Sequence, residues 1–232
     1  PYYDLTGEID CRKQRDIRLF GDVTYWWVFN DKGNVHTETN GPAIGMEIRA
    51  QAFAFATNDE VNDMTFYNYE LVNRSSFTLT NAYFGQWVDP DLGCSNDDYV
   101  GCDVQRGLGY CYNGDGQDED CNGNAGYGTQ PPAVGVDFFE GPYQDNDGID
   151  NPGPYDERSA PFGIKNITYQ DAKNGNGIPY LGMGIGYGDS VPDNERFGMR
   201  RFVYYNRGGG VQGDPQTALD HYNYLRGIWR DG

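Results

Sequence analysis

The sequence predicts an all-β fold, an antiparallel β-sandwich with long loops and one short C-terminal helix. Aromatic residues make up 15% of the chain, with 19 Tyr, and such side chains favour the pleated surface of a sheet. The 33 Gly and 12 Pro mark frequent turns. Several stretches alternate between apolar and polar residues, which is the period of a half-buried strand.

Residues 1–88 are expected to form a strand meander. Residues 23–29 (VTYWWVF) are aromatic and β-branched, and turn residues follow them. Residues 46–57 (MEIRAQAFAFAT) alternate along their length, which predicts a strand with one covered face. Two more strands are expected at residues 64–73 and 77–88, separated by a polar turn.

Residues 89–195 are expected to be an acidic, loop-rich insertion, interrupted by a short strand near residues 133–139. Residues 196–232 return to regular structure. RRFVYYN at 200–206 predicts a strand, and TALDHYNYLRGIW at 217–229 has apolar residues at helical spacing. We expect a single β-rich domain over residues 1–232. Because the chain begins at Pro1 and has no signal peptide, we expect it to be a mature product or a piece of a longer protein.

The formal net charge of −18 argues against a nucleic-acid partner, because phosphate binding needs clustered Lys and Arg. It also argues against electrostatic docking to an anionic membrane. The sequence has no apolar run of about 18 residues, so no membrane insertion is expected.

Residues 89–156 carry the strongest chemical signal in the chain. They hold thirteen Asp and two Glu but one basic residue, Arg106. Carboxylates at this density in Gly- and Asn-rich turns repel one another unless a cation lies among them. Ca²⁺ takes six to eight oxygen ligands from carboxylates, carbonyls and water. The long loops are therefore expected to bind calcium, with more than one ion.

The candidate metal ligands fall into four groups. The alternative for the first group is an ordinary acidic surface loop, and the alternative for the fourth is a solvated strand edge. The first group is Asp89, Asp91, Asp97, Asp98 and Asp103. The second is Asn113, Asp115, Asp118 and Asp120. The third is Asp145, Asp147 and Asp150. The fourth is Asp171, Asn174, Asn176, Asp189, Asp193 and Glu195. The sharpest expectation is one structural site made by Asp89, Asp91, Asp98 and Asp103.

The third group shares an Asp-x-Asp-Gly turn with EF-hand loops, but it is not an EF-hand. Aligning Gly148 with the loop glycine puts Tyr143 at the first ligand position and Pro154 at the last. A shorter calcium loop remains the alternative there.

Four of the five cysteines lie in the acidic block, which suggests an oxidising compartment and a disulfide-stapled loop region. Two pairings are open. The nested one joins Cys102 to Cys111 inside Cys94–Cys121, and the sequential one joins Cys94 to Cys102 and Cys111 to Cys121. Cys11 is left alone in both. The spacings do not fit a zinc site.

Catalytic patterns are missing from the sequence. It has no HExxH, GxSxG or phosphate-binding GxxxxGK[ST] motif, and His36 and His221 have no evident nucleophile partner. A glycosidase needs only two carboxylates about 5–10 Å apart, so glycan hydrolysis is not excluded. Aromatic side chains could stack on sugars, although Trp26, Trp27 and Trp87 are more simply explained as core residues.

Several long strings resemble a family of large secreted proteins of Bacteroidota that carry a C-terminal type IX secretion sorting domain. They include GMEIRAQAFAFATNDEVNDMTFYNYELVNRSS, DDYVGCDVQRGLGYCYNGD and DNERFGMRRFVYYN. The resemblance implies an extracellular or cell-surface location and a parent protein longer than this chain. It implies little about activity.

These observations lead to a non-enzymatic, calcium-stabilised structural or adhesive module of a bacterial cell-surface protein or filament. The expected partners are other extracellular protein subunits or surface glycans, and a homo-oligomer or filament fits the same hypothesis. The alternative is a glycan-binding or glycan-hydrolysing domain.

Overall fold

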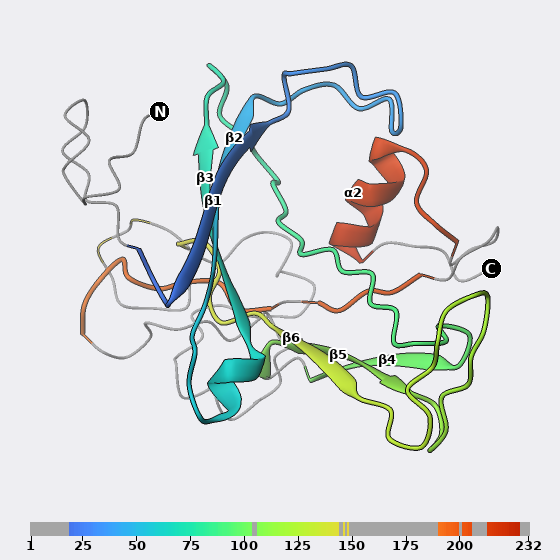
Figure 1. The fold of residues 1–232 in the computed structure, drawn as a ribbon. Coiled ribbons are helices and arrows are strands. Elements are labelled where there is room, and N and C mark those ends of the chain that lie inside the picture. Colours follow the sequence, from blue (N-terminus) through green and yellow to red (C-terminus); the bar gives the residue numbers. More distant parts are fainter. Residues whose placement is uncertain are drawn as a thin grey trace, which may run out of the picture. The chain divides into compact units, whose positions relative to one another are not determined.

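The protein is mostly β, with two three-stranded antiparallel sheets and one short C-terminal helix (Figure 1). This computed structural model describes residues 19–103, 106–143, 146, 148, 190–199, 201–205 and 213–227. The chain divides into two compact units. One comprises residues 1–82 and 216–220, and the other comprises residues 83–215 and 221–232. The expected single domain stays a prediction.

The first sheet confirms three of the strands expected near the N-terminus. It consists of β1 (Val23–Asn30), β2 (Met46–Ala54) and β3 (Thr65–Asn73), with β2 in the centre. The pairing is antiparallel throughout, and Ala50 lies opposite Trp27 on one side and Tyr69 on the other. Since neighbouring side chains on a strand point to opposite faces, this register gives the sheet two chemically different faces.

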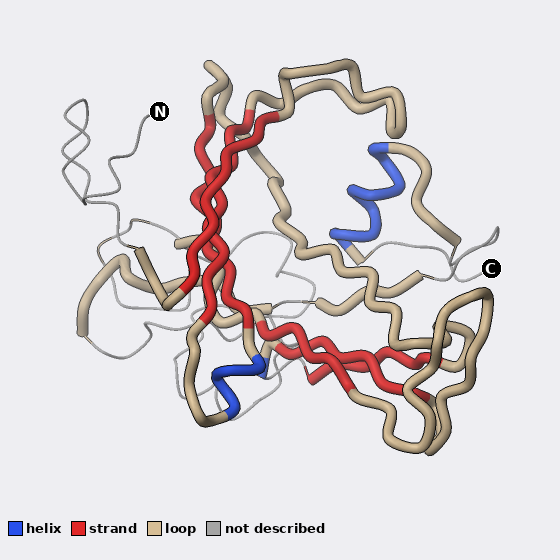
Figure 2. Tube along the Cα trace, in the orientation of Figure 1, coloured by secondary structure: helices blue, strands red, loops and turns tan. Residues whose placement is uncertain are grey.

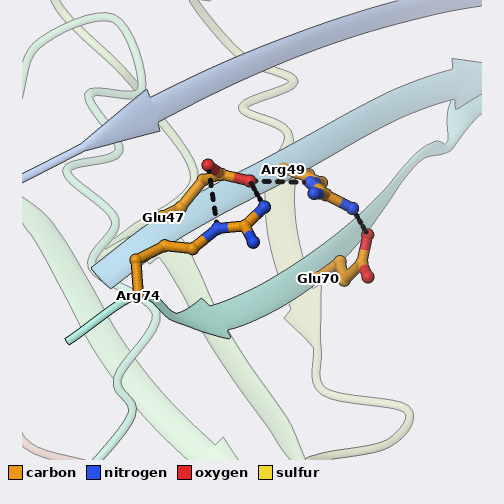
Figure 3. A network of polar contacts seen from close by, with 4 residues as sticks. All are labelled: Glu47, Arg49, Glu70 and Arg74. Carbon is orange, nitrogen blue, oxygen red and sulfur yellow. Dashed lines mark hydrogen bonds and ion pairs between the residues drawn. The ribbon is translucent and has the colours of Figure 1, made fainter. Parts of the chain in front are cut away.

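One face of the first sheet combines a phenylalanine cluster with an ion-pair network. The rings of Phe53 and Phe66 stack with centroids 5.3 Å apart, and Phe20 and Phe55 contact the Phe53 ring as well. Further along the same face, the side chains of four residues connect in the order Arg74, Glu47, Arg49 and Glu70 (Figure 3).

The connections of the first sheet are held by carboxylates that accept backbone N–H groups. Between β1 and β2, the Asp31 carboxylate accepts bonds from the backbone N–H groups of Ile44, Gly45 and Met46. Between β2 and β3 lies the 3₁₀ helix η1 (Glu60–Asp63), drawn blue in Figure 2, and Asp59 caps it by accepting a bond from the Val61 N–H. These carboxylates replace the partners that the strand ends lack.

The second sheet was only partly expected. It consists of β4 (Asp98–Asp103), β5 (Leu108–Asn113) and β6 (Ala133–Asp137), with β5 in the centre. The strand near 133–139 is confirmed, but the expectation of loop over residues 98–113 is wrong. LGYCYN alternates Tyr with Gly and Cys, and DYVGCD holds Tyr and Val between two Asp, so both segments fit a pleated hairpin.

Two expected strands are not formed in the described part of the chain. Residues 77–88 are irregular, and so are residues 201–205. In the first case Asn81 has a left-handed φ of 53°, which interrupts an extended strand. Gly85 then lies so close to Leu225 that an added Cβ would come within 2.3 Å of its side chain. This segment therefore packs against a helix residue instead of pairing in a sheet.

The C-terminal helix α2 (Ala218–Arg226) confirms the expectation from helical spacing. Thr217 and Asp220 form a capping box, in which the Asp220 N–H donates to the Thr217 hydroxyl and the Asp220 carboxylate accepts from the Thr217 N–H. Gly227, with a φ of 65°, follows the last turn and ends the helix earlier than expected. In the ranges the structure describes, no helix has the length and apolar character needed to cross a membrane.

Candidate functional site

The acidic loops next to the second sheet are organised around one disulfide and one buried carboxylate. Cys94 and Cys121 form the disulfide, 27 residues apart in sequence. Asp118 is 1% exposed, and its two oxygens accept backbone N–H bonds from Cys94 at 2.9 Å and Tyr127 at 2.7 Å. Gly93, with a φ of 67°, leaves the space for this carboxylate, since an added Cβ would lie 2.0 Å from it. Asp118 thus anchors the two sides of the disulfide loop.

A second group of acidic and amide oxygens lies where β4 begins and β5 ends; we call Asp97, Asp98 and Asn113 the β4–β5 corner. Asp98 and Asn113 lie directly opposite each other in the ladder, so their side chains share a face. Asp98 Oδ2 accepts a bond from the Leu92 N–H at 2.9 Å. The other carboxylate oxygen of Asp98, one oxygen of Asp97 and the amide oxygen of Asn113 are buried without a hydrogen-bond partner.

The surroundings of Asp98 disfavour its charged form. Burial raises the pKa of this carboxyl, the bond from Leu92 lowers it, and the nearby carboxylates of Asp97, Asp118 and Asp91 raise it again, so that the net shift is upward. The corner therefore contains negative charge and buried acceptor oxygens, and the charged groups that act on Asp98 are all carboxylates.

Asp103 does not belong to this corner, which corrects the sharpest expectation from the sequence. Asp98 and Asp103 are the first and last residues of the six-residue strand β4, so about 17 Å of extended chain separates them. No single ion can bind both side chains. Asp103 instead forms an ion pair with Arg106, the one basic residue of the acidic block, at a distance of 2.6 Å.

The remaining candidate ligands are dispersed. Asp115 and Asp120 accept backbone N–H bonds from Gln117 and Gly126 in their own loops, and Asp193 accepts one from the distant Gly148. Asp89 and Asp91 are exposed, and Glu195 is buried. The described residues contain no cluster of three or more His, Cys, Asp or Glu side chains placed to hold a metal ion. Asp145, Asp147, Asp150, Asp171, Asn174, Asn176 and Asp189 lie outside the described residues.

The cysteines settle one of the open pairings. The Cys94–Cys121 disulfide is the outer pair of the nested arrangement, and the sequential arrangement is wrong. The inner pair is not formed, because Cys102 and Cys111 are free thiols, one exposed and one buried. The ladder places Cys102 opposite Gly109 and Cys111 opposite Val100. The two cysteines are therefore diagonal neighbours, about 7–8 Å apart, beyond the usual reach of a disulfide. Cys11 lies outside the described residues.

The other face of the first sheet carries aromatic side chains in two rows. The register puts Tyr25 and Trp27 of β1 on the same face as Tyr67 and Tyr69 of β3, with alanines of β2 between the rows. The rings of Tyr67 and Tyr69 are nearly parallel, with an interplanar angle of 8°. We call this surface the aromatic face, and Phe29 and Leu71 extend it.

The aromatic face is open to solvent, which corrects the assignment of Trp27 to a core. Trp27 is 38% exposed and Tyr25 is 67% exposed, and Trp87 in the other unit is 63% exposed. Trp26 points to the opposite face and is half-buried, in keeping with its expected packing role. A sheet face that presents aromatic rings to water has the chemistry of a binding surface.

A smaller tyrosine row on the second sheet was missed in the sequence. Tyr99 of β4 lies opposite Tyr112 of β5, and Tyr110 lies beside Tyr112 with ring centroids 6.0 Å apart. All three are exposed. The alternation of Tyr with Gly and Cys in GYCYN would have identified this row once the segment was treated as a strand.

Comparisons with known proteins add no family or fold assignment: no family model, no curated protein and no solved structure matches the chain.

Proposed function

We propose that the chain is a non-enzymatic, calcium-stabilised module of a bacterial extracellular protein, with a structural or adhesive role at the cell surface. The observation that carries the proposal is the β4–β5 corner, where buried acceptor oxygens of Asp97, Asp98 and Asn113 have no hydrogen-bond partner. A bound cation would satisfy them and would link the loops to the sheet.

The disulfide supports the extracellular part of the proposal. Disulfides persist in oxidising compartments and are rare in the cytosol. Cys94–Cys121 closes a loop that has little core of its own, and bound ions are the natural complement to such a staple. The face-to-face packing of the two sheets as a sandwich, the type IX secretion route and assembly with other surface proteins are parts of the same proposal.

The test is the melting temperature of the whole chain with calcium and after treatment with EDTA. A ligand that binds only the folded state raises stability, by about 2.7 kcal/mol when its concentration is 100 times the dissociation constant. We expect the melting temperature to rise with calcium and to fall with EDTA. A melting temperature that EDTA leaves unchanged would remove calcium from the proposal.

Glycan binding is the second candidate, and the aromatic face favours it. Two rows of rings, of which Tyr25, Trp27 and Tyr67 are exposed, flank a floor of small side chains, Ala50 and Ala52, on the three-stranded sheet. Rings of this kind stack on the apolar faces of sugars, while the tyrosine hydroxyls can bond to sugar hydroxyls.

The glycan candidate can be tested with two tryptophans that are both exposed but lie in different units. If the aromatic face binds sugars, Trp27→Ala should abolish the signal of the chain on a glycan array, and the matched control Trp87→Ala should keep it. An array on which the unmodified chain gives no signal would dispose of this candidate.

A further inference from the structure

We propose that Asp98 and Asn113, with Asp97 beside them, form one specific calcium site that joins the start of β4 to the end of β5. This inference rests on the proposed calcium-stabilised module and names the ligands. It unites residues that the sequence places in two separate groups, and it excludes Asp103.

Asn113 provides the observation that distinguishes this corner from an ordinary acidic surface. It is 7% exposed, and its amide nitrogen donates to the backbone carbonyls of Asp115 at 3.3 Å and Gln117 at 3.1 Å. Rotating the amide would bring its oxygen against those two carbonyl oxygens, so these contacts fix the orientation. The amide oxygen is thereby turned away from them, and it is buried without a hydrogen-bond partner.

Asp98 brings the first carboxylate to the same place. It is the direct cross-strand partner of Asn113, and such partners have Cβ atoms about 4.5–5.5 Å apart. One oxygen of Asp98 is held by the Leu92 N–H, which positions the carboxylate, and the other oxygen is buried without a hydrogen-bond partner. The positioned oxygen and the free oxygen thus have separate roles.

Asp97 brings a second carboxylate next to the first. Its backbone carbonyl accepts a bond from the Gly114 N–H at 2.8 Å, which fixes Asp97 beside the residue that follows Asn113. One of its side-chain oxygens is also buried without a hydrogen-bond partner. The corner therefore offers three buried oxygen atoms from three side chains, and backbone contacts hold the side chains of Asp98 and Asn113.

These oxygens need a donor or a cation, because they are all acceptors. A carboxylate and an amide oxygen cannot satisfy each other, and a buried polar atom without a partner destabilises the fold. Arg106 lies at the far end of β4 and pairs with Asp103. A divalent cation with hard oxygen preference satisfies all three atoms at once.

Calcium fits this set better than magnesium. Ca²⁺ accepts six to eight oxygens in irregular geometry, so water and backbone carbonyls can complete a site with three side-chain ligands, whereas Mg²⁺ demands a near-ideal octahedron. A site with two carboxylates corresponds to the weak affinity of extracellular modules, on the order of 10⁻⁴–10⁻³ M.

The experiment compares Asp98→Asn with the matched control Asp103→Asn, which removes the same charge from the other end of the same strand. The melting temperature of each full chain is followed as calcium chloride is added after EDTA treatment. We expect the Asp98→Asn chain to need at least tenfold more calcium for half of the thermal shift, and the Asp103→Asn chain to stay within twofold of the unmodified chain.

A second readout separates a calcium ligand from a merely structural carboxylate. In EDTA, Asp98→Asn should be as stable as the unmodified chain or more stable, because the new amide can donate to Asn113 and a buried charge is gone. If this variant fails to fold, Asp98→Ser replaces it, because the smaller hydroxyl side chain also removes the charge and can still accept the Leu92 N–H bond. It should likewise need at least tenfold more calcium than the unmodified chain.

The outcomes distinguish the site from the broader proposal. If the unmodified chain and Asp98→Asn respond to calcium equally, or if both Asn variants lose the response equally, the site is wrong while the calcium-stabilised module stands. An Asp98→Ser chain that responds to calcium like the unmodified chain also overturns the site. If EDTA and calcium leave the unmodified chain unchanged, the calcium role and the site fall together.

Discussion

The two sheets treat their carboxylates in opposite ways. In the first sheet, a hydrogen bond from Arg74 and the neighbouring Arg49 lower the pKa of Glu47 to about 2, although partial burial acts against them. Burial also raises the pKa of Asp31, but backbone N–H groups outweigh it and the net pKa is lowered. In the second sheet, burial and three neighbouring carboxylates raise the pKa of Asp98. The first sheet compensates these two carboxylates internally, whereas the neighbours that act on Asp98 in the second sheet are themselves carboxylates.

This difference indicates where each region obtains its stability. The first sheet has long paired strands, stacked rings and an ion-pair network, so its contacts suffice to order it (Figures 1 and 3). Around the second sheet, the buried apolar residues in the described part of the chain are Leu92, Cys94 and Cys111, whereas the first sheet buries Ala50. The second region adds the covalent Cys94–Cys121 link to these contacts.

The largest effect that would sharpen the comparison is expected from Asp118→Ala. It leaves the N–H groups of Cys94 and Tyr127 without their acceptor in a buried place, at about 1–3 kcal/mol each. We expect a loss of roughly 2–6 kcal/mol in the free energy of unfolding, measured by urea denaturation. Faster hydrogen exchange should appear around residues 93–97 and 118–128, with β1–β3 unchanged. Equal acceleration in both sheets would contradict this division of stability.

Removal of the disulfide comes next. For a sequence separation of 27, the chain-entropy model gives about 3.5 kcal/mol for Cys94–Cys121. The Cys94→Ser, Cys121→Ser double variant should therefore unfold at clearly lower urea concentration. Cys102→Ser is the matched control, because that thiol is exposed and unpaired, and it should leave the midpoint nearly unchanged. If the urea midpoint of the Cys102→Ser control falls as far as that of the double variant, the loss in stability does not come from the disulfide.

Asp31→Asn tests the first sheet in a graded manner. The Asp31 carboxylate accepts hydrogen bonds from the backbone N–H groups of Ile44, Gly45 and Met46. Asp22 accepts one such bond, from Ala56 at 2.8 Å. An amide has one acceptor oxygen, so Asp31→Asn should lower the free energy of unfolding by about 1–2 kcal/mol. Asp22→Asn should cost less. The reverse order would contradict the role of Asp31 in closing the loop between β1 and β2.

The sequence predicted the first sheet well because its signals are local. Alternation in residues 46–57 and the aromatic run at 23–29 report directly on pleated strands, and Thr217 with Asp220 marks the helix start. The β4–β5 hairpin was hidden because its strands begin or end with the acidic residues that also predict loops. Which oxygens meet depends on register, and register places Asn113 against Asp98 while it removes Asp103. Composition cannot supply that information.

The smallest effect concerns the pH dependence of the Arg49 and Arg74 network around Glu47. The folded-state pKa of Glu47, about 2, lies below its ordinary value of 4.5. The Glu47 carboxylate therefore stabilises the fold fully above about pH 5 and loses that contribution as the pH falls toward 2. Glu47→Gln should lower the melting temperature slightly at pH 7, and the difference from the unmodified chain should shrink to zero near pH 2. Because the network is partly exposed, added salt should reduce the difference as well.

Glu38→Gln is the control. It removes the same charge from the exposed loop between β1 and β2 and should show neither trend. If the difference in melting temperature between Glu47→Gln and the unmodified chain stays constant from pH 7 to pH 2, the Glu47 side chain acts through packing. Asp31 would then be the one carboxylate that supports the internal charge compensation argued for the first sheet.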